Sequence, residues 1–139
     1  MELKAEEILK IHVQCNDAYE VKNDGAGHLN VIPIVSGDFT GKIKGTVVNG
    51  GADWNTRRLN GNSHVFAKYL LQADNGEYIA IENEGKIGSK DWSNRIKTVP
   101  RFQVSEESEF AWLNSGVYVG ELVSGEAKNQ VEITIYRLL

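Results

Sequence analysis

The feature that most constrains the fold of this chain is a strict alternation of apolar and polar residues in short segments. In residues 9–15 the odd-numbered positions are Leu, Ile, Val and Cys, and the even-numbered positions are Lys, His and Gln. Residues 130–139 repeat the pattern with Val131, Ile133 and Ile135. A period of two is typical of a β-strand with one buried face. The chain is therefore predicted to fold from half-buried strands.

Turns rich in Gly, Asn and Asp separate these segments. Asp74-Asn75-Gly76 is the clearest, because Asn-Gly favours the type I′ turn of a β-hairpin. The sequence shows no amphipathic helix of useful length, so we predict an all-β fold. The specific prediction is a single antiparallel up-and-down β-barrel of about eight to ten strands with little helix. We expect one domain over residues 1–139, in which the last strand pairs with the first and so removes both sheet edges.

The sequence also predicts the local structure of four segments. Residues 49–62, with glycines at both ends, are predicted to be a loop, and residues 36–38 a turn. Residues 85–94 are predicted to be a loop that carries Trp92. Residues 110–122 are predicted to form one long strand with a kink at Ser115-Gly116.

Charge and motif content exclude several functional classes. The net charge is −4 and no basic stripe is present, which argues against nucleic acid and anionic membrane surfaces as partners. No apolar run approaches the length of a transmembrane helix. Because Cys15 is the single cysteine, no intramolecular disulfide can form, and a cytoplasmic location is the default expectation. The chain has neither a phosphate-binding glycine loop nor a nucleophile-elbow motif, so we expect no cofactor.

Metal binding has little support in the sequence. His12, His28 and His64 are scattered, and the chain has no Cys-x-x-Cys or His-x-x-x-His spacing. Three strands of a barrel could still bring the histidines together. We predict no metal site, and we interpret Cys15, which is in phase with Ile11 and Val13, as a buried inert thiol.

Aromatic and charged residues concentrate around Gly50-Gly51-Ala52-Asp53-Trp54, and they define a candidate site. The candidate residues are Asp53, Trp54, Arg57, Tyr69, Glu82, Arg101 and Trp112. One interpretation is structural: the tryptophans fill the core and the charges pair at the barrel rim. The other is a ligand pocket, since aromatic walls with a few polar groups are typical of small-molecule sites.

In the pocket interpretation the polar residues have different roles. Asp53, with its pKa raised by desolvation, would be the catalytic acid or base. Arg57 or Arg101 would bind an anionic group or stabilise an oxyanion. Lys68 would be a second proton-transfer group if its strand face points inward, and a solvated surface residue if that face points outward. The sequence leaves this phase open.

The same motifs resemble the DUF3237 family, also called UPF0311, over nearly the whole chain. The resemblance rests on Gly50-Gly51-Ala52-Asp53-Trp54, Pro100-Arg101-Phe102 and Phe110-Ala111-Trp112-Leu113-Asn114, in this order. It implies a single antiparallel β-barrel of no established general activity, with Asp53 and Trp54 at its most distinctive positions. The chain departs from the family pattern at Phe66 and Lys68, where relatives often carry Asp and Arg. Relatives also often have Asp-Gly in place of Asn60-Gly61 and Phe-Glu in place of Phe102-Gln103.

Two functional hypotheses remain. The first is a barrel that binds a small aromatic or anionic metabolite, with or without cofactor-free isomerase, cyclase or lyase chemistry. The second is a non-enzymatic interaction or assembly barrel that forms a homodimer. The barrel interior discriminates between them, because a cavity of a few hundred Å³ that holds Asp53 supports binding, and an interior filled by side chains supports assembly.

Overall fold

The alternating segments form strands of one continuous antiparallel sheet. The computed structural model describes residues 1–90 and 95–139. Its elements are β1 (Ala5–Cys15), β2 (Tyr19–Asn23), β3 (Gly27–Gly41), β4 (Gly45–Val47), β5 (Gly51–Arg58), β6 (Ser63–Ala73), β7 (Tyr78–Ile87), β8 (Ile96–Gln103), the short 3₁₀ helix η1 (Ala111–Asn114), β9 (Tyr118–Ser124) and β10 (Gln130–Leu138).

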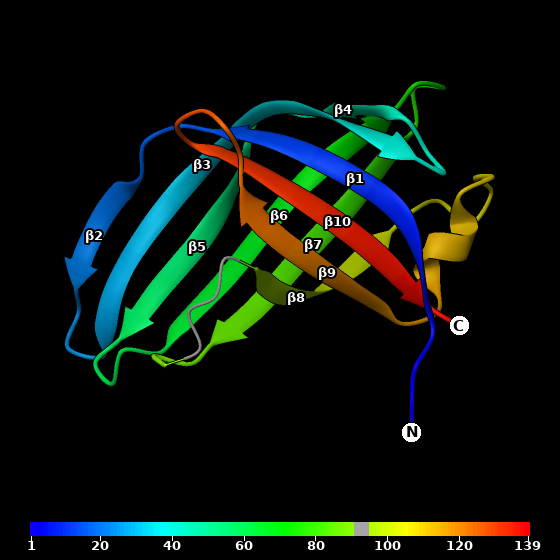
Figure 1. Ribbon diagram of the computed structural model, residues 1–139. Coiled ribbons are helices and arrows are strands. Elements are labelled where there is room, and N and C mark those ends of the chain that lie inside the picture. The colour runs from blue at the N-terminus through cyan, green and yellow to red at the C-terminus, as the bar shows by residue number, and fades with distance from the viewer. Residues whose placement is uncertain (91–94) are drawn as a thin grey trace.

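The sheet closes on itself as a barrel. β1 pairs with β10 from Ala5 opposite Leu138 to Gln14 opposite Gln130, so the first and last strands lie side by side (Figure 1). On its other edge β1 pairs with β3. Both β4 and β5 lie between β3 and β6, and β2 pairs with β3 outside the closed ring. The result is a closed eight-stranded antiparallel barrel with two extra strands, which confirms the predicted fold class and the pairing of the two terminal strands.

The predicted loop at residues 49–62 is wrong over most of its length. Residues 51–58 form β5, which pairs with β3 on one side and β6 on the other. The alternation of apolar residues could not reveal this strand, because the inward positions of β5 carry the polar residues Asp53 and Asn55. The predicted turn at 36–38 is also wrong, since β3 continues through it and pairs with β1 there.

The predicted long strand at 110–122 is interrupted. Residues 111–114 form η1, and the strand begins only at Tyr118. The Tyr118 hydroxyl group donates to the backbone carbonyls of Trp112 and Ser115, at 3.1 and 2.9 Å, and holds the turn between the helix and β9. Of the predicted loop at 85–94, residues 85–87 belong to β7, and Trp92 lies outside the described residues.

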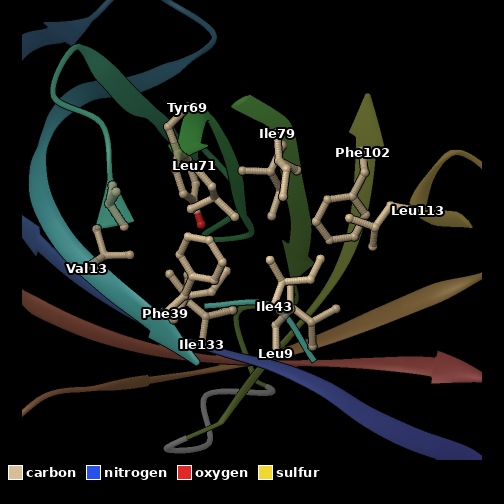
Figure 2. Close-up of a cluster of buried hydrophobic side chains, with 14 of the residues drawn as sticks. Leu9, Val13, Phe39, Ile43, Tyr69, Leu71, Ile79, Phe102, Leu113 and Ile133 are labelled. Atoms are coloured by element: carbon tan, nitrogen blue, oxygen red, sulfur yellow. The ribbon is translucent and has the colours of Figure 1, made fainter. Parts of the chain in front are cut away.

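The barrel interior has two unlike halves. One half is a close-packed apolar cluster that includes Leu9, Phe39, Leu71 and Ile79, each no more than 1% exposed (Figure 2). Leu113 of η1 belongs to the same cluster and lies near Phe102. Further along the same strands, the inward residues surround a cavity instead. The candidate functional site is this second half.

Close approach of β1 and β3 requires glycine at position 37, which gives a testable prediction. Gly37 has φ +148°, and a Cβ there would lie 1.9 Å from the backbone oxygen of His12. We expect Gly37→Ala to lower the free energy of unfolding by about 1–3 kcal/mol, because the strand pair must shift apart. Urea unfolding measures this. Gly50→Ala is the matched control, since Gly50 has φ +124° but a Cβ there would meet no atom within 4 Å; equal losses in both variants would contradict the steric explanation.

Candidate functional site

An interior cavity of about 210 Å³ occupies one half of the barrel. Its walls come from strands on every side of the ring. The apolar lining residues are Val13, Ile32, Ile34, Val65, Ala67, Ile96, Leu122, Val131 and Ile133, and the others are Cys15, Asp53, Asn55, Tyr69, Asn83 and Thr98. The interior is therefore not completely filled by side chains, and the cavity holds Asp53.

Strand register arranges three of the lining residues in a row across the barrel wall. Asp53 on β5 lies opposite Ala67 on β6, and Ala67 lies opposite Asn83 on β7. Directly opposed residues in an antiparallel pair project to the same face of the sheet. The small Ala67 side chain thus separates an acidic group from an amide group, and all three face the cavity.

The Asp53 carboxyl group is held in a mainly apolar environment. Burial raises its pKa, and this effect outweighs the opposing influences of a hydrogen bond and of nearby His64. The hydrogen bond is donated by the backbone N–H of Phe66 to Oδ1, at 3.0 Å. A carboxyl group with a raised pKa can exist protonated or ionised closer to neutral pH, which is what general acid or base catalysis requires.

Two further ionisable groups beside Asp53 are held in their neutral forms. Burial, followed by the proximity of Cys15 and Asp53, raises the pKa of the Tyr69 hydroxyl group. Burial and then Asp53 raise the pKa of the Cys15 thiol. Figure 2 shows the Tyr69 hydroxyl oxygen pointing into the barrel interior. Both groups can therefore contribute hydrogen bonds, but not negative charge, to a molecule in the cavity.

Several buried polar atoms have no protein partner. Within residues 1–90 and 95–139, these are the Tyr69 hydroxyl oxygen, Asn83 Oδ1, Thr98 Oγ1 and Asn30 Oδ1. Tyr69, Asn83 and Thr98 line the cavity and are 3–4% exposed. Buried polar groups are normally hydrogen-bonded, and leaving one unpaired costs about 1–3 kcal/mol. These three side chains therefore have hydrogen-bonding capacity beside the cavity that no described protein group satisfies.

Sequence reasoning missed Asn83 and Thr98. A signal for Asn83 was available, because it shares its strand face with the buried residues Ile79 and Ile81. A lone amide on an otherwise apolar face indicates a functional or structural polar contact. Thr98 gave no comparable signal, since threonine is common in strands.

Asp53 and Tyr69 are the candidates that the structure brings together. Trp54 is 52% exposed and lies on the outer face of the barrel, opposite Phe66. Glu82 and Arg101 are opposite one another on β7 and β8, on the face that alternates with the inward Asn83. Arg57 is exposed near the end of β5. None of these four residues lines the cavity.

Trp112 belongs to a different region. It lies in η1, and the Arg137 guanidinium carbon is 5.7 Å from the centroid of its ring, within the range of a cation–π interaction. It lines a separate surface depression with Phe110 and Arg137. Trp112 therefore does not line the cavity that holds Asp53.

The strand register shows which way Lys68 points. Lys68 is an exposed residue between the inward Ala67 and Tyr69, and its Nζ lies 3.3 Å from Glu82 Oε1. Phe66 shares this outer face. Phe66 and Lys68, two of the positions at which the chain departs from the family pattern, are therefore not part of the cavity lining.

The histidines are dispersed over the barrel. His12 contacts Asp38 at 3.0 Å, and His64 contacts Glu84 at 2.7 Å. His28 lies 3.9 Å from Glu20. Among the described residues, no group of three or more His, Cys, Asp or Glu side chains is placed to hold a metal ion. Within residues 1–90 and 95–139, no helix has the length and apolar character needed to cross a membrane.

The raised pKa of Asp53 predicts how pH affects stability. As the pH rises, the Asp53 carboxyl group ionises near its ordinary pKa of 3.8 in the unfolded chain and at a higher pH in the folded protein. The contribution of Asp53 is therefore greatest below that pH and falls as the pH rises through the folded pKa, by about 1.4 kcal/mol for each unit of difference. The difference in unfolding free energy between wild type and Asp53→Asn, measured in urea from pH 3 to 8, should decrease with pH.

Asp24 provides the control of opposite sign. Backbone N–H groups of Ala26 and Gly27 lower its pKa, so its contribution to stability is lost as the pH falls. The difference in unfolding free energy between wild type and Asp24→Asn should therefore increase with pH. A flat or rising curve for Asp53→Asn would show that the folded protein does not disfavour the Asp53 carboxylate.

Fold and site together define a closed antiparallel β-barrel with a mainly apolar cavity that holds a half-buried carboxyl group. The chain belongs to the family described as proteins of unknown function, DUF3237, whose model matches residues 3–138. It is 26% identical over 146 residues to a UPF0311 protein of Bradyrhizobium diazoefficiens, an alignment that covers 95% of this chain and 94% of the relative. A UPF0311 protein of Clostridium acetobutylicum is 32% identical over 101 residues, or 71% of this chain and 58% of that protein.

Solved structures share the fold. A β-barrel-like protein from Acinetobacter baumannii is 28% identical, with a TM-score of 0.84 and coverage of 100% of this chain and 98% of that one. A protein of unknown function from Rhodopseudomonas palustris has a TM-score of 0.87 at 24% identity, covering 100% and 99% of the two chains. A structure described as an enzyme from Penicillium herquei has a TM-score of 0.74 at 20% identity, with coverage of 100% and 96%. At these identities the last two likenesses concern the fold alone.

Proposed function

We propose that this protein binds a small organic molecule inside the barrel and that Asp53 exchanges a proton with it. The observation that carries the proposal is the half-buried Asp53 carboxyl group, with its raised pKa, in a cavity of about 210 Å³. Burying a carboxyl group in an apolar interior is unfavourable for stability. Such a group is often found where a site needs its altered acidity.

The cavity volume limits the ligand. An apolar protein cavity of about 150 Å³ can hold benzene. The cavity here is about 210 Å³, so a molecule with one ring and a few substituents matches it. The walls of Val, Ile and Leu would contact the ring, and the polar atoms would orient it.

The chemistry that fits is proton transfer without a cofactor, such as isomerisation, cyclisation or elimination. Asp53 would donate a proton to, or accept a proton from, a carbon or oxygen atom of the substrate. The neutral Tyr69 hydroxyl group would supply a hydrogen bond. The structurally similar Penicillium herquei protein is described as an enzyme, which is consistent with catalysis by a barrel of this fold.

A thermal-shift screen against neutral and anionic single-ring metabolites tests the binding proposal. A ligand at 100 times its Kd should add about 2.7 kcal/mol of stability. Ala67→Leu should abolish the shift because it narrows the cavity, whereas Trp54→Ala, on the outer face, should preserve it. A shift that disappears only in Trp54→Ala would move the site to the outside of the barrel.

The exposed outer face favours a second candidate, the homodimer. Trp54 and Val99 are 52% and 48% exposed, and Phe66 lies between their strands. Exposed aromatic residues are enriched where proteins associate. Sedimentation equilibrium of wild type and Trp54→Ser tests this proposal. A dimer that Trp54→Ser dissociates would support it, and a monomer at high micromolar concentration would oppose it.

A further inference from the structure

We infer that Asn83 and Thr98 form a polar cradle for a hydroxyl group of an uncharged, single-ring ligand whose opposite end faces Asp53. This inference rests on the proposed function, because it names the ligand class of the same cavity. It adds two binding residues and a direction for the ligand.

The cradle is formed by side chains from β7 and β8 and by a glycine on β9. Thr98 lies opposite Gly120 in the β8–β9 pair. A Cβ on Gly120 would lie 2.2 Å from Thr98 Oγ1 and 3.6 Å from Asn83 Oδ1. Both oxygen atoms therefore lie close to the Gly120 backbone, and any larger residue at position 120 would clash with Thr98 Oγ1. Neither has a hydrogen-bond partner among the described residues.

The ligand direction follows from the row of Asp53, Ala67 and Asn83. These residues occupy three successive strands in direct register. Adjacent strands lie about 4.8 Å apart, so the backbones that carry Asp53 and Asn83 are about 10 Å apart. With alanine between them, a single ring with polar groups on opposite edges can extend from one to the other.

The charge of the lining selects an uncharged ligand. Among the described residues, no Lys, Arg or His lines the cavity. The carboxyl group in the lining is that of Asp53. The raised pKa values of the Cys15 thiol and the Tyr69 hydroxyl group keep those two residues neutral. An anion would enter an apolar space without a counter-ion and beside a carboxyl group, which is strongly unfavourable. The ligand class is therefore narrower than the aromatic or anionic molecule expected from the sequence.

Three probes of similar size test the inference: 4-hydroxybenzyl alcohol, with two hydroxyl groups; toluene, with none; and 4-hydroxybenzoate, with a carboxylate. NMR titration of the backbone amides of residues 15, 67 and 83 reports on occupancy of the cavity. We expect 4-hydroxybenzyl alcohol to bind the wild type at least tenfold more tightly than either of the other probes. Thr98→Val and Asn83→Leu should each weaken its binding at least fivefold and leave toluene binding unchanged or tighter.

The Tm of the Thr98→Val variant provides an internal check on folding. Thr98→Val nearly preserves shape and removes an unpaired hydroxyl group, so it should raise the Tm of the unliganded protein while weakening binding of the alcohol. A lower Tm together with unchanged selectivity would show that the hydroxyl group has a structural role and would overturn the inference.

The remaining outcomes separate the inference from the proposed function. If toluene and the alcohol both bind, but the variants leave the preference for the alcohol unchanged, the cradle is wrong and the binding cavity stands. Tighter binding of 4-hydroxybenzoate would overturn the uncharged class. If no probe shifts the cavity amides even at millimolar concentration, the proposed function fails together with the inference.

Discussion

Phe39→Ala is expected to lower the free energy of unfolding by about 3–5 kcal/mol, the usual range for removing a fully buried aromatic side chain. Phe39 is 1% exposed and lies opposite Ile11 in the β1–β3 pair. Its ring also approaches Gly45, where a Cβ would lie 2.8 Å from a ring carbon. Because strands on several sides of the barrel contact this ring, they cannot easily collapse into the space that alanine leaves. Equilibrium urea unfolding would measure the loss.

Phe39→Leu is the matched control. It keeps an apolar side chain of intermediate size, so its loss should be clearly smaller than that of Phe39→Ala. Equal losses would indicate that the shape of the aromatic ring, rather than the buried volume, determines the stability of the packed half. A loss below about 1 kcal/mol in Phe39→Ala would contradict the close packing of Phe39 in the apolar cluster.

Asp53→Asn is expected to reduce turnover of any substrate found for this protein by about 10²–10⁴-fold, the range typical of a lost general acid or base. Asparagine preserves the shape and can still accept the hydrogen bond from the Phe66 N–H, but it cannot exchange a proton near neutral pH. Steady-state kinetics should therefore show a fall in kcat with a much smaller change in KM.

Asn55→Ala is a suitable comparison, since Asn55 lines the same cavity from the same strand and is not assigned a proton-transfer role. It should change KM more than kcat. Unchanged kcat in Asp53→Asn would exclude proton transfer by Asp53, although the cavity could still bind ligand without it.

The barrel could be predicted from sequence because its signals are local. Alternation in residues 9–15 and 130–139 defines which residues share a strand face, and an Asn-Gly turn defines a hairpin, without knowledge of any distant residue. The alternating pattern also indicated that Asn83 shares a face with Ile79 and Ile81. Its meaning was missed because the direction of that face relative to the barrel centre was unknown.

β5 shows where local signals fail. Its inward residues Asp53 and Asn55 are polar, and its outward Trp54 is apolar, which is the reverse of the pattern that identifies a half-buried strand. Burial beside a cavity, rather than within a packed core, permits this reversal. The same reversal led sequence reasoning to group Trp54 with Asp53, although adjacent residues of a strand point to opposite faces.

The sequence by itself determined an antiparallel barrel, its closure by the terminal strands and membership of a family, since these depend on periodicity, turns and motifs along the chain. Only the tertiary structure decided which residues meet in the cavity. Asp53, Asn83 and Thr98 come from three different strands, and their convergence depends on the register of each strand pair. A shift of one residue in any of these registers would turn a strand's inward side chains to solvent, so the site is a property of the closed sheet and not of any one segment.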